Sequence, residues 1–144
     1  MKISSTLFAV LMITLITSSC AQPPEISIED AWARPGFQGD NSAVYLTINN
    51  GTDQGDGLIG AVSDVANLTE VHLSKMDADG TMTMERQDLV GIPANKVVEL
   101  SPGGLHVMLV NLVQDLNVGD TFRLTLNFQR AGDIEVEVEV KQPE

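Results

Sequence analysis

Several residue types are scarce in this chain, and each shortage excludes a class of protein. One cysteine, Cys20, is present, so a disulfide within one chain is impossible. Eight Lys and Arg stand against 20 Asp and Glu, for a formal net charge of -12. Phosphate contacts need clustered basic side chains, so we expect no nucleic-acid partner. No Ser–His–acid or Cys–His arrangement can be assembled from so few candidates, and we expect the protein not to be an enzyme.

The first 20 residues have the pattern of an export signal. Lys2 supplies a positive start, an apolar run covers residues 7–16, and residues 17–21 are small or polar. The apolar run is too short to span a bilayer and is typical of a signal peptide. Its removal deletes Lys2 and no acid, which changes the formal charge from -12 to -13. We therefore predict an exported protein.

Cys20 lies at the end of this segment, where bacterial lipoproteins carry a lipid on the new N-terminal cysteine. Thr17 stands where such signals usually have leucine. The alternative is ordinary cleavage after Ala21, with Ser19 and Ala21 as the small residues, and we favour lipidation. Residues 21–25 then form a short tether, and 26–144 form one domain. A lipid on Cys20 would be the only contact with a membrane.

The domain alternates apolar and polar residues at period two, with turn residues every eight to twelve positions. This spacing predicts an all-β, antiparallel sandwich or barrel. The predicted strands are Ile26–Trp32, Ser42–Ile48, Gly57–Val62, Thr69–Lys75, Thr81–Gln87, Lys96–Leu100, Leu105–Val110, Thr121–Phe128 and Ile134–Val140. No 11-residue segment has convincing helical periodicity. Glu135, Glu137 and Glu139 alternate with valines, which indicates a solvated strand face and not a catalytic set.

The only two histidines of the chain each lie close to methionines. His106 and Met108 are two apart in a strand and share a face, while Leu105, Val107 and Leu109 take the core face. His72 likewise alternates with Val71 and Leu73. Both histidines should therefore point away from the core, which indicates a soft-metal site near the surface.

A three-residue hairpin loop at Asp77–Asp79 would place His72 directly opposite Met84, with Gly80 at the loop exit. A loop of two or four residues would instead put Met84 on the other face. Joining this pair to His106 and Met108 requires neighbouring strands, which the sequence does not prove. Met76 and Met82 would be accessory ligands or, more simply, surface residues. Trp32 and Tyr45 would pack in or near the core, with shielding of the metal site as the alternative.

The spacing of these four residues resembles the signature of the periplasmic copper chaperone family PCu(A)C. Ten residues separate Leu73 from Met84, 21 separate Met84 from His106, and one separates His106 from Met108. The matching segments also include Asp30–Pro35, Ala43–Asn50, Glu70–Leu73 and Pro102–Leu109. The resemblance covers roughly residues 26–140. Leu73 departs from it, because many members have methionine there, and the chain lacks the Met- and His-rich tail that some members carry.

The resemblance implies a cupredoxin-like β-sandwich with Greek-key connections and one Cu(I) ion bound by His72, Met84, His106 and Met108. It also implies a copper carrier of the bacterial periplasm that serves assembly of the Cu(A) centre of cytochrome c oxidase. Its recipient would be oxidase subunit II or a thiol-dependent copper chaperone.

The ligand types themselves favour a carrier. Two imidazoles and two thioethers are all neutral, and soft sulfur favours the reduced ion. A blue-copper electron carrier needs a cysteine thiolate, which the mature domain does not offer at such a site. That class, and a metal-free β-sandwich binding module, are the alternatives.

Overall fold

The computed structural model describes residues 25–143, which form one β-sheet domain. The predicted export signal, the start of the tether and Cys20 lie outside the described residues. The strands are β1 (Ile26–Ala33), β2 (Ser42–Asn50), β3 (Asp56–Val62), β4 (Ala66–Met76), β5 (Met82–Arg86), β6 (Val90–Ile92), β7 (Lys96–Leu100), β8 (Leu105–Leu112), β9 (Thr121–Phe128) and β10 (Gly132–Val140).

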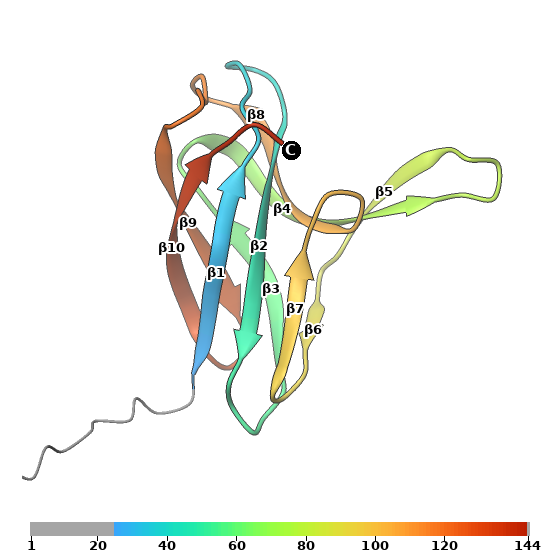
Figure 1. Ribbon diagram of the computed structural model, residues 1–144, viewed down its shortest axis with the longest axis vertical. Helices are drawn as coiled ribbons and strands as arrows, with labels where there is room; N and C mark the ends of the chain where they lie inside the picture. Colours follow the sequence, from blue (N-terminus) through green and yellow to red (C-terminus); the bar gives the residue numbers. More distant parts are fainter. Residues whose placement is uncertain (1–24, 144) are drawn as a thin grey trace, which may run out of the picture.

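The strands pair in the order β5-β4-β8-β2-β1-β10-β9-β3-β6, and β7 also pairs with β2. The pairs are antiparallel except that of β1 with β10. This sheet curls over into two packed layers (Figure 1). The hairpin of β4 and β5 is the exception, because its outer end extends away from both layers (Figure 1). The all-β, mostly antiparallel fold predicted from the alternation is confirmed, and of the sandwich and the barrel that the alternation left open, it is the sandwich.

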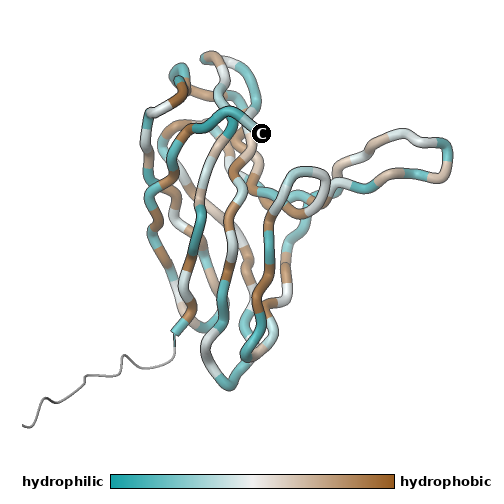
Figure 2. Tube along the Cα trace, in the orientation of Figure 1, coloured by the Kyte–Doolittle hydropathy of each residue, from teal (hydrophilic) through white to brown (hydrophobic). Residues whose placement is uncertain are grey.

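The core lies between the layers and is made by the apolar residues of the period-two pattern. On β9, Phe122, Leu124, Leu126 and Phe128 are buried, and their neighbours are wholly or partly exposed. On β8, Val107 and Leu109 are fully buried. Figure 2 shows this alternation of hydrophilic and hydrophobic residues along the strands. Burying one such side chain contributes about 1.5–3 kcal/mol, so these faces fix the strand registers.

Nine of the ten strands lie where the alternation predicts them, with ends that differ by a few residues. The strand that was missed is β6, whose three residues are too few for an alternating pattern. It pairs with the start of β3 and adds buried Val90 and Ile92 to the core.

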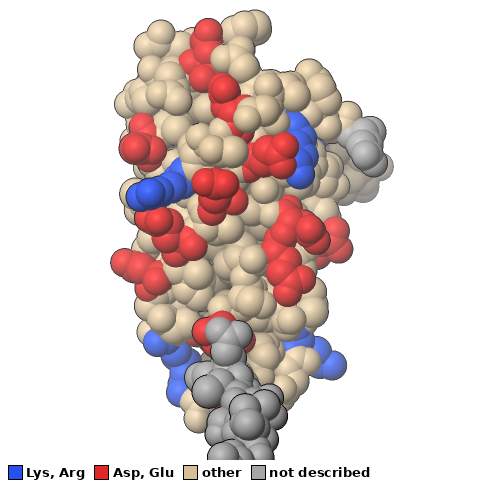
Figure 3. Space-filling view, turned by 60° about the vertical axis from the view of Figure 1, so that its left-hand side comes forward, with Lys and Arg blue, Asp and Glu red and all other residues tan. Residues whose placement is uncertain are grey.

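The glutamates of β10 lie on its exposed face, as predicted: Glu135, Glu137 and Glu139 are exposed, and Val138 and Val140 are buried. Figure 3 shows Asp and Glu spread over one face of the molecule, with fewer Lys and Arg among them. Within residues 25–143, no helix is long and apolar enough to cross a membrane.

Candidate metal centre

The two histidines meet on neighbouring strands. β4 pairs with β8 in a register that sets His72 directly opposite His106, and their ring centroids lie 5.9 Å apart. A metal–nitrogen bond is about 2.0–2.1 Å long at zinc sites, and the ring centre lies roughly 1 Å beyond the nitrogen. Two imidazoles on one ion would therefore have centroids within about 6 Å of each other. The contact between the two ligand segments, which the sequence left open, is present.

The predicted pairing of His72 with Met84 is wrong. Met84 lies opposite Ser74, and His72 lies opposite Arg86. The loop does have three residues, but they are Ala78, Asp79 and Gly80, because Asp77 N–H donates to the Thr81 carbonyl (2.8 Å). Such loops end on a residue in the left-handed region, and Gly80 has a φ of 84°. Gly80 is therefore the last loop residue and not the first residue after it.

This shift moves the register by two, and a shift of two leaves every side chain on its face. Met84 is thus the diagonal neighbour of His72 on the same face of the β4–β5 hairpin. Diagonal cross-strand neighbours are about 7–8 Å apart, which a long thioether side chain can bridge. The predicted shared face survives, although the predicted direct opposition does not.

One ring nitrogen of His106 is held by the turn before its own strand. His106 Nδ1 lies 3.1 Å from the Gly104 carbonyl oxygen. A carbonyl only accepts, so Nδ1 carries the proton and Nε2 keeps its lone pair. The same carbonyl accepts the Ser74 backbone N–H (3.0 Å). The turn therefore fixes the ring and ties β8 to β4 at the same point.

His72 is held by an acidic partner. Its Nε2 lies 2.9 Å from Glu70 Oε2, and Glu70 Oε1 accepts a hydrogen bond from Arg86 Nη1 (2.8 Å). An ionised carboxylate only accepts, so Nε2 carries a proton, and in the neutral ring Nδ1 then keeps the lone pair. Within the described chain, Nδ1 of His72 is buried and has no hydrogen-bond partner. A buried polar atom without a partner is costly, and a bound metal would satisfy it.

The thioethers converge on the same region. A hollow of about 440 Å³ is lined by Met82, Met84, His106 and Met108, together with Tyr45 and Arg34. Three of the four predicted ligands therefore border one space. His72 is not among the lining residues, but it stands beside His106, and its side chain is 14% exposed. In the described residues no three His, Cys, Asp or Glu side chains group as metal ligands. A metal here would therefore depend on methionine sulfur.

His106 is less accessible than expected. It points away from the apolar core, as predicted, yet it is only 4% exposed. Tyr45 covers it with a ring centroid 6.4 Å away, and Trp32 stacks behind Tyr45 at 4.7 Å. Arg34 lies over the Tyr45 ring. The predicted position near the surface therefore does not hold for His106, because Tyr45 of β2, backed by Trp32 of β1, covers it.

This cover also keeps His106 neutral. Burial, the largest influence, lowers the pKa of His106 below its ordinary value of 6.5, and the nearby His72 and Arg34 act in the same direction. The hydrogen bond to Gly104 opposes them without reversing the outcome. A metal ligand must be unprotonated, and His106 is in that state at neutral pH.

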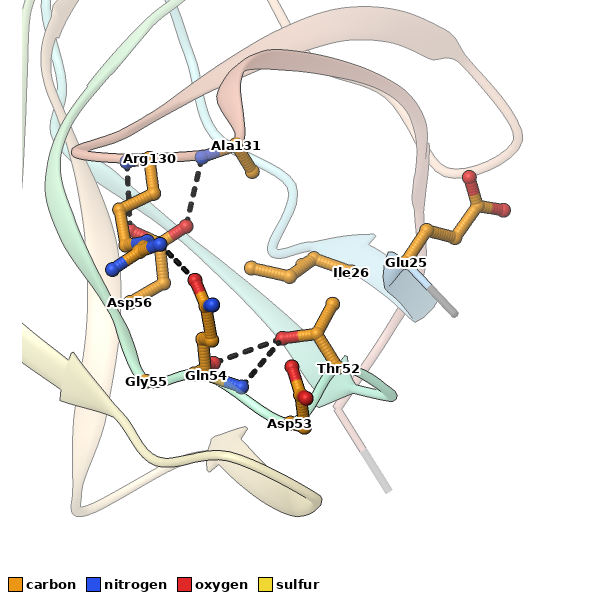
Figure 4. A pocket seen from close by; sticks show the side chains of 9 residues that line it. All are labelled: Glu25, Ile26, Thr52, Asp53, Gln54, Gly55, Asp56, Arg130 and Ala131. Atoms are coloured by element: carbon orange, nitrogen blue, oxygen red, sulfur yellow. Dashed lines mark hydrogen bonds between the residues drawn. The ribbon is translucent and has the colours of Figure 1, made fainter. Parts of the chain in front are cut away.

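A second hollow lies at the Thr52–Asp56 turn and is bordered by Arg130 and Ala131 (Figure 4). The Asp56 carboxylate in this hollow accepts hydrogen bonds from the backbone N–H groups of Gly57, Arg130 and Ala131 (2.7–2.9 Å). Burial raises the pKa of Asp56, but these hydrogen bonds together outweigh it and lower the pKa. Asp56 therefore acts as a structural tie between loops.

Sequence reasoning missed the residues that hold the histidines. Glu70 carries a detectable signal, because it lies two residues before His72 and hence on the same strand face. The Gly104 carbonyl leaves no signal in the sequence, because every residue has a backbone carbonyl oxygen. Tyr45 comes from β2, and only the pairing of β2 with β8 places it above His106.

Comparison with known proteins gives a family match over nearly the whole described domain. Residues 26–140 match the family model described as "Putative lipoprotein LpqE-like". The chain is 30% identical over 121 residues to "Putative lipoprotein Lxx21020" of Leifsonia xyli subsp. xyli (strain CTCB07). It is 34% identical over 102 residues to "Uncharacterized protein RP573" of Rickettsia prowazekii (strain Madrid E). These alignments cover 83% and 67% of this chain, but 72% and 56% of the relatives.

Solved structures with the same fold include copper-bound domains. The "Copper-bound PCuAC domain from PmoF2" is 30% identical, with a TM-score of 0.69, and the match covers 83% of this chain and 94% of that domain. "CuI-DR1885" from Deinococcus radiodurans is 25% identical, with a TM-score of 0.59, and the match covers 88% of this chain and 83% of that one. These neighbours agree with the cupredoxin-like sandwich predicted from the sequence.

Proposed function

Since this chain belongs to the LpqE-like family, which is the PCu(A)C family of copper-chaperone domains, we propose that it is a Cu(I) carrier. It would bind one Cu(I) ion through His72, Met84, His106 and Met108 and pass it to a recipient protein. It would act as a carrier and not as an enzyme. Copper-bound members of the fold, at 25–30% identity, support this proposal.

The observation that carries the proposal is the pair of oriented histidines. Each ring has one nitrogen held by a hydrogen bond, His72 by Glu70 and His106 by Gly104, which leaves the other nitrogen with a lone pair. Histidines that ligate metals are held in this way by a carboxylate or a backbone carbonyl. Because the two residues are directly opposed and their ring centroids lie 5.9 Å apart, the proposed ion would lie between the two rings.

The methionines select the oxidation state. Met84 and Met108 border the hollow beside His106, and thioether sulfur is a soft ligand that suits Cu(I). Zinc is disfavoured, because its usual protein ligands are Cys, His and carboxylate. No redox change is needed to take up or release the ion, which suits delivery better than electron transfer.

The proposed ligands differ in exposure, and this difference suits transfer of the ion to a partner protein. His106 is 4% exposed, whereas Met84 is 56% exposed on the projecting hairpin. A partner's ligand can approach the ion from the side of Met84 while the histidines still hold it. We infer that Met84 leaves first during transfer and that the histidines leave last.

The location and the recipient belong to the same proposal. The family description and one relative's name both contain the word lipoprotein, which supports an exported protein anchored through a lipid on Cys20. In a bacterial periplasm the recipient would be subunit II of cytochrome c oxidase, for its Cu(A) centre, or a thiol-dependent copper chaperone. Mass spectrometry of the mature protein tests the anchor, and an unmodified N-terminus at Gln22 would disprove it.

Titration with Cu(I), followed by X-ray absorption at the copper edge, tests the function directly. We expect one ion per chain, bound by two nitrogen and two sulfur ligands. Retention of no copper after reconstitution would leave a metal-free β-sandwich and overturn the proposal. An intense blue Cu(II) form would indicate an electron carrier instead.

A further inference from the structure

The methionines outside the four-ligand set form a row on the projecting hairpin. Met76 at the end of β4 lies directly opposite Met82 at the start of β5. Both are exposed, Met76 by 65% and Met82 by 52%. An apolar side chain on an outward hairpin gains little from burial, so packing does not explain two methionines facing each other there.

Met84 extends this row towards the histidines. Residues two apart on a strand share a face, so Met82 and Met84 project together, and Met76 joins them across the hairpin. His72 lies on that face as well, four residues before Met76. Met82 and Met84 also border the hollow that contains His106 and Met108. One face of the hairpin therefore carries sulfur from its tip to the histidine pair.

We propose that Met76, Met82 and Met84 form a loading position for Cu(I), built from three thioethers and separate from the histidine site. This inference rests on the proposed copper-carrier function. Directly opposed residues have Cβ atoms about 4.5–5.5 Å apart, and Met has three rotatable bonds. Three such side chains can therefore converge on one ion. Sulfur-only ligation selects Cu(I) and excludes the harder divalent ions.

Met84 would belong to both positions, so the ion moves between them without being released. Met76 and Met82 leave as His72, His106 and Met108 bind, and Met84 stays on the ion throughout. The exchange is of neutral ligands only, with no change in oxidation state and no proton transfer. Because Met84 is shared, one ion occupies one position at a time.

The test removes the histidine site and asks whether copper still binds. In His72→Ala/His106→Ala protein we expect residual binding of Cu(I) through sulfur alone, visible at the copper X-ray absorption edge. Adding Met76→Leu/Met82→Leu should lower this residual affinity by about tenfold or more, measured by competition with a chelator. Equal affinity with and without Met76 and Met82 would overturn the loading position.

A matched control keeps the number of methionines constant. Lys75 and Thr83 are directly opposed on the other face of the same hairpin. Lys75→Met/Thr83→Met is added to the protein that already carries His72→Ala, His106→Ala, Met76→Leu and Met82→Leu. This restores two thioethers, but on the opposite face of the hairpin from Met84. We expect the Cu(I) affinity of this protein to stay low. Recovery of the lost affinity would show that methionine content alone matters, and it would overturn the proposed geometry.

A second measurement leaves the histidines in place, because His106 is buried and its replacement could unfold the protein. Methionine methyl groups labelled with ¹³C report on each sulfur as Ag(I), a redox-inert soft ion, is added to the unaltered chain. We expect the Met84 methyl signal to shift with the bound ion, and the Met76 and Met82 signals to broaden as the ion exchanges between the two positions. Signals of Met76 and Met82 that stay fixed while Met84 moves would overturn the inference.

These outcomes separate the two proposals. If the unaltered chain binds no Cu(I), the proposed function fails, and the loading position fails with it. If it binds one Cu(I) through nitrogen and sulfur but Met76 and Met82 affect neither residual affinity nor methyl signals, only the loading position fails. Met76→Leu/Met82→Leu with intact histidines should slow loading while leaving the final Cu(I) affinity nearly unchanged.

Discussion

His72 and His106 are directly opposed on β4 and β8, and the ring of each is held by a hydrogen bond from one nitrogen. The residues are 34 positions apart in the sequence, so the sheet and not the local chain brings them together. In the proposed site, the methionines would determine which metal this pair of histidines holds.

Replacing Met84 or Met108 by leucine should weaken Cu(I) binding more than any Cu(II) binding. Leucine keeps the apolar volume and removes the soft sulfur, whereas the harder Cu(II) depends more on the imidazoles. Competition with chelators specific for each oxidation state measures both affinities. Val97→Leu, at an exposed position on β7, is the control. An equal loss for both ions would contradict the role of sulfur.

The strand faces of this site could be predicted from the sequence, because alternation at period two is a local property. His106 and Met108 do share a face, and Val107 and Leu109 do lie in the core. The register of the β4–β5 hairpin could not be predicted from the sequence, because it depends on which loop residue takes the left-handed conformation. Gly80 does so as the last loop residue, and moving the loop by one position moves every pair by two.

The burial of His106 also could not be predicted from the alternation of residues around it. The apolar residues on either side of it show only that it faces away from the core. Its cover comes from Tyr45 on β2, supported by Trp32 on β1, because β2 pairs with β8 and β1 pairs with β2. The resemblance to a copper-binding family implied the four proposed ligands together, but not the groups that orient them.

Replacing Asp56 by asparagine should lower the free energy of unfolding by roughly 1.5–3 kcal/mol at neutral pH, the range for a hydrogen bond to a charged group. The amide loses the charge and turns one acceptor into a donor facing a backbone N–H. Chemical denaturation measures the difference, with exposed Asp88→Asn as the control. Equal stability of Asp56→Asn and the unaltered chain would contradict the proposed loop tie.

The effect of Asp56 should also depend on pH. Its pKa is lowered in the folded protein, so its contribution is complete above the unfolded value of about 3.9 and is lost as pH falls through the folded pKa. The gap in stability between the unaltered chain and Asp56→Asn should therefore narrow below about pH 4. A gap that is constant from neutral to strongly acidic pH would contradict the lowered pKa.

Cu(I) binding should weaken in acid, with His106 resisting protonation longer than a free imidazole. Its pKa lies below the ordinary 6.5, chiefly because of burial, and protons compete with copper only below that pKa. The His106 ring-proton signal of the copper-free protein should titrate with a midpoint under 6.5, and chelator competition should show affinity falling in the same range. A flat affinity profile would contradict histidine ligation.

Replacing Glu70 by glutamine should weaken Cu(I) binding about 10–100-fold, the usual effect of losing a group that orients a metal ligand. Glu70 accepts hydrogen bonds from both His72 and Arg86, which fixes the His72 tautomer with the proton on Nε2 and the lone pair on Nδ1. Glutamine offers one acceptor for the two donors, so His72 is left free to change tautomer.

Nitrogen-15 spectra of the imidazole separate this positioning role from a general structural one. In the unaltered copper-free protein Nε2 should appear protonated and Nδ1 unprotonated, and in Glu70→Gln the two forms should mix. Glu135→Gln, on the exposed face of β10, should change neither the spectrum nor the affinity. A Glu70→Gln protein with an unchanged His72 tautomer and weakened copper binding would show that Glu70 acts by another route than orienting His72.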